Sequence, residues 1–570
     1  MERHFSILLA VILTTAASAL IGGVAHAAES IAVDGPSFDL KRWEKTLRRA
    51  GASPAEIAKF DDMVKDQSPN DLPSFEDYLR STPPSTMTQT LRSIVRNEQE
   101  SAPPALLPTS APMMPCESLR GLPLPETTID SAVPAPDGSC RVTATVVHSP
   151  ADNPIKVFIA LPMRGWNGRF RGTGGGGYSG GSASNLDGPV SKDYAVGATD
   201  TGNPAGTANF ALDAHGKQAW NRLRNNAYRG IHDMTVVGKA LTQAFYGRAA
   251  RYAYFVAEST GGRQALTEAQ RYPDDYDGIL ALYPAIARDR YVPAQLWPQV
   301  LMHEAGDYLP RAKLDAATAA AVKACGGPDG IIANPTQCSY DPTELVGRAV
   351  GDSTFTPQDT EVIRGIWEGP RDHDGGFLWW GPTRGTDLSI LADTVGTPLQ
   401  GKPFGEGLDW FRYFLVLDPK WDWQTLTRTN FELLFAQSIH VHASTYGGDD
   451  PDLTAFRSRG GKLLMVHGWA DQLVPAQESI AYYRQVQRRM GGAERTADFL
   501  RLFLVPGADH GFSGPVPAPS IGAMISALMQ WVETGRAPDQ LNAERLGARN
   551  KIIKLRTLLP YRVERLDTGP

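Results

Sequence analysis

From about residue 140 onwards, short apolar runs alternate with stretches of helical periodicity. The runs at 140–149, 155–162 and 250–259 are rich in β-branched and aromatic residues, whereas residues 227–247 carry apolar side chains at helical spacing. Strands that alternate with helices in this way are typical of a mostly parallel sheet covered by helices. We therefore predict an α/β fold.

The alternation is interrupted in the middle of the chain. Residues 287–445 are rich in Trp, Gly and Pro and carry only short helical patterns, and strand-like runs return at 460–471 and 499–510. The simplest account is one α/β domain, formed by residues 111–286 and 446–570, with a large insertion at 287–445.

The N-terminus has the features of an export signal. A basic start is followed by an apolar run that ends in Ala25, His26 and Ala27, so we expect a signal peptide at 1–27 that is cleaved after Ala27; the alternative is an uncleaved anchor. Helical patterns followed by a proline-rich linker then predict a small helical extension at 28–110. No later segment is apolar enough to cross a bilayer.

Charge and cysteine content narrow the class of protein. The formal net charge of -6 argues against a nucleic-acid partner or an anionic membrane surface. In an exported protein, the four cysteines are expected to form disulfides. Three pairings are possible, and sequence separation favours Cys116 with Cys140 and Cys325 with Cys338.

One strand-to-helix junction has the pattern of a nucleophile elbow. Ser259 lies between an apolar strand and a helix, with the small residues Ala257 and Gly261 on either side. The pattern is A-x-S-x-G, and an elbow requires small residues at these positions because the strained backbone passes close to its neighbours. An ordinary serine N-cap is the alternative interpretation.

Two later residues favour the catalytic interpretation. Asp471 and His510 each follow a strand-like run, in the order serine, acid, histidine that is typical of α/β-hydrolases. Each of them alone could be an ordinary loop residue, but the three together in this order and context predict a catalytic triad of Ser259, Asp471 and His510.

Acyl transfer also requires backbone N–H donors for the oxyanion. We expect one donor at Thr260, directly after the serine, and the other at Gly176 or Gly177 in the glycine-rich segment 172–177. That segment also matches G-x-G-x-x-G, but no helix follows it to hold a pyrophosphate, so we predict no dinucleotide cofactor.

Several blocks of the sequence resemble the tannase and feruloyl esterase family, which includes mono(2-hydroxyethyl) terephthalate hydrolases. The blocks extend from about residue 116 to 545, in the family's order: WNGRF, GTGGGGYSGG, YAVGATDTGN, ESTGGRQALTEAQRYPDDYDGILALYPA, AFRSRGGKLLMVHGWADQLVP, RLFLVPGADHGFSGP and WVETGRAPDQL. The resemblance implies an α/β-hydrolase fold, a lid formed by the insertion, and a serine esterase that acts on esters of aromatic acids.

The resemblance also implies roles for further residues. Ser259, Asp471 and His510 match the family's triad, and His467 matches a histidine that lies near the substrate. Trp379 and Trp380 fall in the lid, where aromatic residues pack on the substrate's ring; burial in the lid core is the alternative.

The sequence departs from the family pattern in three places. The family usually has a disulfide between the residue before the serine and the residue after the histidine, where this chain has Glu258 and Gly511. Glu258 could instead hydrogen-bond the His510 loop or favour its imidazolium, or it could point toward the substrate or solvent.

The other two departures concern the lid and a loop of the core. The family's calcium loop keeps only Asp329 as a carboxylate, which is too few oxygen ligands for a calcium ion, and Asn203 stands where the family has histidine. We therefore expect no required cofactor and no metal; the alternative is a residual structural calcium site, of which Asp329 would be the only remaining carboxylate.

Together these features predict a secreted or periplasmic serine carboxylesterase whose partner is a small aromatic ester, such as an ester of gallate, ferulate or terephthalate. An esterase for aliphatic or polyester-fragment esters is the alternative within hydrolases. A non-catalytic secreted binding protein is the alternative outside them.

Overall fold

The computed structural model describes residues 39–65, 79–80, 83–85, 87–88, 91–92, 109–149, 153–546 and 552–562. The predicted signal peptide and most of the predicted linker lie outside these residues. Within the part of the chain that is described, no helix is both long and apolar enough to span a membrane.

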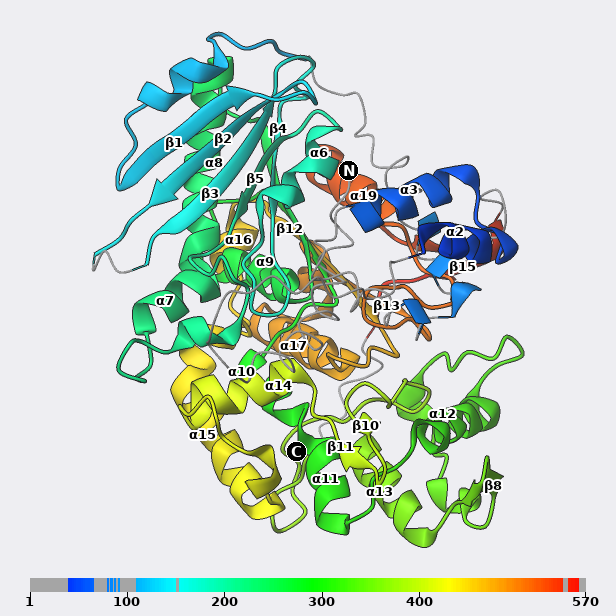
Figure 1. Cartoon of the computed structure of the whole chain (residues 1–570). Helices are drawn as coiled ribbons and strands as arrows, with labels where there is room; N and C mark the ends of the chain where they lie inside the picture. The colour runs from blue at the N-terminus through cyan, green and yellow to red at the C-terminus, as the bar shows by residue number, and fades with distance from the viewer. Residues whose placement is uncertain are drawn as a thin grey trace.

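A nine-stranded sheet is the centre of the molecule (Figure 1). The strands follow the order β1-β2-β3-β5-β4-β6-β7-β12-β13; β1, β2, β3 and β5 pair antiparallel, and β5 to β13 pair parallel. Their bounds are β1 (Thr127–Pro134), β2 (Ser139–Val146), β3 (Ile155–Pro162), β4 (Arg169–Thr173), β5 (Ala195–Thr199), β6 (Tyr252–Glu258), β7 (Gly278–Leu282), β12 (Lys462–Gly468) and β13 (Leu500–Val505). The predicted α/β fold is confirmed.

The central strands are apolar because both of their faces are covered. In β6, Phe255 packs on one side of the sheet, and Tyr254 and Val256 pack on the other. A parallel strand buried on both faces is expected to be a near-continuous hydrophobic run. Consecutive apolar residues rather than strict alternation therefore marked β6 in the sequence.

Helices cover both faces of the sheet. The helices α8 and α9 contact the strands from β3 to β7. Helix α19 contacts β7 and β12 from the opposite face, on which Tyr254 and Val256 of β6 also pack. The bounds in the core are α6 (Asp187–Val190), α7 (Trp220–Arg224), α8 (Gly230–Tyr246), α9 (Thr260–Arg271), α16 (Thr454–Ser458), α17 (Ala476–Arg489), α18 (Ala493–Ala497) and α19 (Ile521–Thr534).

The insertion lies between β7 and β12 and forms a separate, mainly helical layer, which occupies the lower part of Figure 1. Its elements are α10 (Arg288–Ala294), α11 (Trp297–Ala305), α12 (Arg311–Cys325), β8 (Ala349–Val350), β9 (Ser353–Thr354), α13 (Pro357–Glu368), β10 (Thr394–Val395), β11 (Gln400–Gly401), α14 (Gly405–Trp410) and α15 (Arg428–Tyr446). This layer is large and rich in Trp, as expected for a lid that covers one edge of the sheet.

Both predicted disulfides are present. Cys116 pairs with Cys140 in the core, and Cys325 pairs with Cys338 in the insertion. Each disulfide closes a short loop, so it reduces the conformational freedom of the unfolded chain mainly within that loop.

The two ends of the described chain form small additional units. The N-terminal helices α2 (Leu40–Arg49) and α3 (Pro54–Lys65) share a separate apolar cluster that includes Leu47, Ile57 and Phe60. At the C-terminal end, β14 (Leu541–Leu546) and β15 (Ile552–Leu558) form an antiparallel hairpin that the sequence did not predict.

Candidate active site

Ser259 stands at a strained turn between β6 and α9. Its backbone has φ 54° and ψ -123°, a conformation that a residue with a side chain rarely adopts. The space around it is tight, since a Cβ on Gly261 would lie 2.8 Å from the Cβ of Ala257 and one on Gly262 would lie 2.7 Å from Pro284. The small residues in the sequence are those that this turn requires.

The N-cap interpretation of Ser259 does not fit this geometry. Ser259 occupies the position before the first residue of α9, but its side chain makes no capping hydrogen bond. Its hydroxyl is therefore not used by the helix, and the residue lies directly after β6, at the carboxyl edge of the sheet where ligands bind in open α/β sheets.

Asp471 and His510 lie at the same edge of the sheet, beyond the ends of β12 and β13. The Nδ1 atom of His510 is 2.7 Å from Oδ2 of Asp471. The other oxygen of Asp471 accepts hydrogen bonds from the backbone N–H groups of Leu473 and Val474, at 2.9 and 2.8 Å. The carboxylate is thus held in one orientation toward the imidazole.

The electrostatics of this pair suit a charge-stabilised histidine. Burial opposes the ionisation of Asp471, but the attraction of His510 and the hydrogen bonds from His467 and His510 outweigh it and lower the pKa of this carboxyl. Burial likewise opposes the charge on His510, and Asp471 outweighs it and raises the pKa of the imidazole. Asp471 is therefore ionised across the neutral pH range.

Among the described residues, Ser259 and His510 form no hydrogen bond with each other. This contact is often long in unliganded serine hydrolases and shortens when substrate binds. The structure thus brings His510 and Asp471 into direct contact and places Ser259 at the same sheet edge.

The glycine-rich segment packs against the start of α9. The N–H of Gly175 donates to Gln264 Oε1 and the N–H of Gly261 donates to the carbonyl of Gly175, both at 3.0 Å. The hydroxyl of Thr260 donates to the carbonyl of Gly177 at 2.9 Å. Since the N–H of Gly175 is already used, Gly176 and Gly177 remain the candidates for the second oxyanion donor.

The predicted substrate contact of His467 is wrong. His467 is fully buried in β12, where Nδ1 lies 2.8 Å from Ser479 Oγ and Nε2 lies 3.1 Å from Asp471 Oδ2 and 3.0 Å from the Val474 carbonyl. Two oxygen acceptors face Nε2, so this nitrogen carries the proton and Nδ1 accepts from Ser479. His467 therefore donates to Asp471 and helps to hold its carboxylate in place. Its other ring nitrogen faces Ser479 of α17 (Ala476–Arg489), so the buried side chain has no open side toward a substrate.

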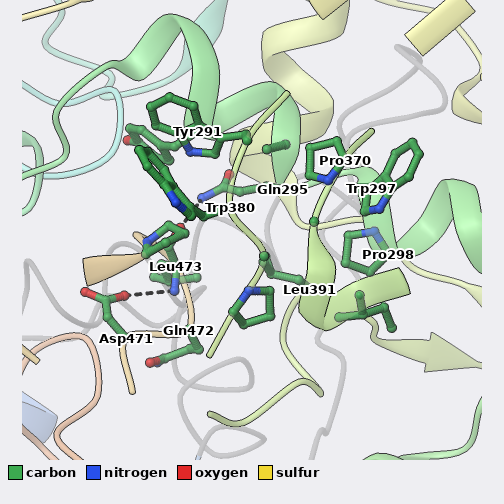
Figure 2. A pocket seen from close by; sticks show the side chains of 17 residues that line it. Tyr291, Gln295, Trp297, Pro298, Pro370, Trp380, Leu391, Asp471, Gln472 and Leu473 are labelled. Atoms are coloured by element: carbon green, nitrogen blue, oxygen red, sulfur yellow. Dashed lines mark hydrogen bonds between the residues drawn. The ribbon is translucent and has the colours of Figure 1, made fainter. Parts of the chain in front are cut away.

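Trp379 and Trp380 line a pocket beside Asp471 (Figure 2). Their rings meet edge to face at 4.5 Å, and Trp379 is only 7% exposed. Within the described structure, the buried indole N–H of Trp379 has no hydrogen-bond partner, so it can donate to a ligand oxygen. The pocket has about 20 Å³ of free space, enough for one water molecule. An aromatic ring can enter it only if these side chains move.

The loop between Cys325 and Cys338 does not fit a calcium ion. Its only carboxylate, Asp329, is paired with Lys554, with Nζ at 3.2 Å, and with Arg556. Calcium requires six to eight oxygen ligands, and this carboxylate already neutralises two cations.

Glu258 is hydrogen-bonded to a tyrosine that contacts His510. The hydroxyl of Tyr283 donates to Glu258 Oε2, and the ring of Tyr283 packs edge-on against His510 with ring centres 4.7 Å apart. Burial raises the pKa of Glu258, although the Tyr283 hydrogen bond and the charges of His510 and Arg171 act in the opposite direction. We therefore infer that Glu258 supports His510 and does not contact substrate.

The variant Glu258→Gln is expected to shift the acid limb of the pH profile of kcat/KM to lower pH. Above its raised pKa, Glu258 is ionised and attracts the imidazolium of His510, so replacing it with Gln makes the neutral base available at lower pH. The profile is measured alongside the melting temperature, with the exposed Glu361→Gln as the matched control. An unchanged profile and melting temperature in Glu258→Gln would show that Glu258 has no role.

Sequence reasoning missed three residues near the site: Tyr283, Arg288 and Glu406. Tyr283 and Arg288 follow the end of β7, the strand beside β6 in the sheet. Because parallel neighbours end at the same edge, the segment after any strand next to the elbow strand was a signal that could have found them. Glu406 belongs to the insertion, and nothing in its local sequence indicates where it lies.

The mixed sheet with its helices on both faces and the serine elbow define an α/β-hydrolase. Among solved structures, the chain resembles a tannin acyl hydrolase from Aspergillus niger, with a TM-score of 0.71 at 25% identity over 80% of this chain and 93% of the other. It also resembles feruloyl esterase B from Aspergillus oryzae, with a TM-score of 0.66 at 24% identity over 78% and 95% of the two chains.

The sequence comparisons identify the family. The model of the family described as "Tannase and feruloyl esterase" matches residues 140–384 and 410–563. A probable feruloyl esterase of Arthroderma benhamiae is 37% identical over 74% of this chain and 79% of its own length, and feruloyl esterase B of Aspergillus niger is 30% identical over 76% and 84%. The chain belongs to this family and is a carboxylic ester hydrolase. The predicted resemblance is confirmed.

Proposed function

We propose that the protein is a secreted serine carboxylesterase that hydrolyses esters of phenolic acids through an acyl-enzyme. The observation that carries this proposal is the hydrogen bond between His510 Nδ1 and Asp471 Oδ2, at the sheet edge where the strained turn presents Ser259. Family membership supports an ester as the substrate. The names of the relatives, feruloyl esterase and tannin acyl hydrolase, support a phenolic acyl group.

In the proposed first step, Ser259 Oγ attacks the ester carbonyl carbon while His510 Nε2 takes its proton. Asp471 orients His510 through Nδ1 and stabilises the imidazolium. The N–H groups of Thr260 and of Gly176 or Gly177 hold the oxyanion. The alcohol leaves with the proton from His510, and the acyl group remains on the serine.

In the second step, water attacks the acyl-enzyme carbonyl and His510 takes a proton from that water. The tetrahedral intermediate collapses, the free acid leaves, and the proton returns from His510 to Ser259 Oγ. We expect Trp380 and the N–H of Trp379, which line the pocket beside Asp471, to contact the acyl group once the lid side chains move.

Two features support a secreted or periplasmic location. The first 27 residues have the composition of an export signal, and the chain forms two disulfides. The disulfides would persist in an oxidising compartment.

A comparison of methyl ferulate, methyl gallate and monomethyl terephthalate with methyl butyrate tests the proposed substrate class. We expect kcat/KM to be at least about tenfold higher for one of the aromatic esters, because pocket contacts with a ring favour it over a short alkyl chain. Faster hydrolysis of methyl butyrate would indicate an aliphatic esterase. Binding of ferulate without turnover of any ester would indicate a binding protein.

A further inference from the structure

Arg288 is a buried cation directly beside the proposed oxyanion hole. It is the first residue of α10, follows the loop after β7, and is 1% exposed. Its guanidinium lies over the ring of Tyr178, 4.6 Å from the ring centre. A buried guanidinium needs partners for its charge and its N–H groups, so its contacts indicate what it does.

The guanidinium connects the insertion to Thr260. Its Nη1 donates to Thr260 Oγ1 at 3.0 Å, and its Nη2 lies 2.6 Å from Oε1 of Glu406 in α14 (Gly405–Trp410). Each of these partners comes from a different part of the chain. Arg288 therefore joins the start of α9 to the lid.

The hydroxyl of Thr260 continues this connection to the glycine-rich loop. A hydroxyl has one hydrogen to donate and lone pairs that accept. Because Arg288 can only donate, Thr260 Oγ1 accepts from it and donates its hydrogen to the carbonyl of Gly177. The direction of every hydrogen bond from Arg288 to Gly177 is thereby fixed.

A second contact joins the same two parts of the molecule. The hydroxyl of Tyr178, the residue after Gly177, donates to the backbone carbonyl of Glu406 at 2.8 Å. The loop that carries Gly177 is therefore held to α14 directly through Tyr178 and indirectly through Arg288.

We propose that Arg288 is a positioning residue of the oxyanion hole, and that Glu406 of the lid holds it in place. The inference rests on the proposed acyl-transfer function. Arg288 sets the distance between Thr260 and Gly177, the two backbone segments that are expected to supply the N–H donors. It does so through the hydroxyl of Thr260, which donates to the backbone carbonyl of Gly177, and lid closure and oxyanion stabilisation are coupled through Glu406.

The effect expected from this role is on turnover more than on substrate affinity. Oxyanion donors stabilise the transition state, and a donor displaced by a fraction of an ångström loses much of that stabilisation. A purely structural role would lower the melting temperature without separating kcat from KM. The two roles therefore give different kinetic results.

The test compares Arg288→Met, Thr260→Val and the double variant on methyl ferulate. We expect each single variant to lower kcat by about 10- to 100-fold, with KM changed less than about threefold. The kcat of the double variant should be no lower than that of the more impaired single variant, because both changes break the same connection. Thr260→Ser keeps the hydroxyl, so it is expected to recover most of the kcat that Thr260→Val loses. The inhibition constant of phenylboronic acid, which forms a tetrahedral adduct with serine, is expected to rise by the same factor as kcat falls.

A matched control separates the proposed role from general destabilisation. Arg169 and Glu533 form another buried pair, with Arg169 Nη2 2.7 Å from Glu533 Oε2, at the opposite end of β4 from the glycine-rich loop. Arg169→Met is expected to lower the melting temperature without lowering kcat. If Arg288→Met does not fold, Thr260→Val tests the same connection from its other end, and full activity in that variant overturns the inference.

Three further results would overturn the inference: wild-type kcat in Arg288→Met, losses that multiply in the double variant, or a Thr260→Ser variant as impaired as Thr260→Val. The proposed function is tested separately with Ser259→Ala. Turnover that survives Ser259→Ala overturns the proposed function and the inference with it. Turnover that depends on Ser259 but is unchanged by Arg288→Met overturns the inference alone.

Discussion

Ser259→Ala is expected to lower kcat on methyl ferulate by at least about 10⁴-fold, because it removes the hydroxyl that is proposed to form the acyl-enzyme. The side chain of Ser259 makes no capping hydrogen bond to α9, so its loss leaves the helix intact. The melting temperature should therefore stay close to that of wild type. The rate is measured under saturating substrate, and the folded state is checked by circular dichroism.

The matched control is Ser458→Ala, which removes an exposed serine at the end of α16. This control should retain wild-type activity. If Ser259→Ala kept more than about one hundredth of the wild-type rate, a serine nucleophile at this position would be excluded.

Asp471→Asn is expected to lower kcat by about 10³- to 10⁴-fold. The carboxylate accepts from His510 through Oδ2 and from two backbone N–H groups through Oδ1. An asparagine whose oxygen keeps the backbone hydrogen bonds must turn its NH₂ group toward His510 Nδ1. That orientation leaves the proton on Nε2, where the imidazole can no longer accept the proton of Ser259.

The same change also affects His467, which lies 3.1 Å from Oδ2 of Asp471. We therefore expect a lower melting temperature together with the loss of kcat, since one NH₂ group cannot accept from two histidines. The exposed Asp498→Asn serves as the matched control and should change neither quantity. An Asp471→Asn enzyme within tenfold of the wild-type kcat would show that another group orients His510.

Most of the fold could be predicted because it is encoded locally. The strand runs that became β6, β12 and β13 are apolar on both faces, and the helices between strands carry apolar residues at helical spacing. The antiparallel hairpin of β14 and β15 was missed, since its strands carry more charged residues than the central ones do.

The site could be predicted in part, and the limit is physical. Ser259 directly follows β6, and Asp471 and His510 lie in the loops after β12 and β13, so parallel topology brings all three to one edge of the sheet. The predicted substrate contact of His467 was wrong because His467 lies inside β12, where its side chain packs against a covering helix. Its partner Ser479 is brought there by the packing of α17, which the local sequence does not specify. The connection from Glu406 through Arg288 depends on how the insertion folds back, which no local pattern specifies.

The same packing explains the position of Glu258, the residue before Ser259. Glu258 is unusual beside a catalytic serine in sequence terms, but in the fold its carboxylate meets Tyr283, which rests against His510. The sequence alone could not identify the hydrogen-bond partner of Glu258. The partner, Tyr283, directly follows β7, and it reaches Glu258 because β7 lies beside β6 in the sheet.

The most direct test of the account is to trap the acyl-enzyme. Wild-type protein is mixed with p-nitrophenyl ferulate, quenched in acid within the first turnover, digested, and analysed by mass spectrometry. The account predicts a feruloyl group on the peptide that contains Ser259, and no such adduct in Ser259→Ala. A feruloyl group on another residue, or rapid turnover with no adduct on the Ser259 peptide, would contradict it.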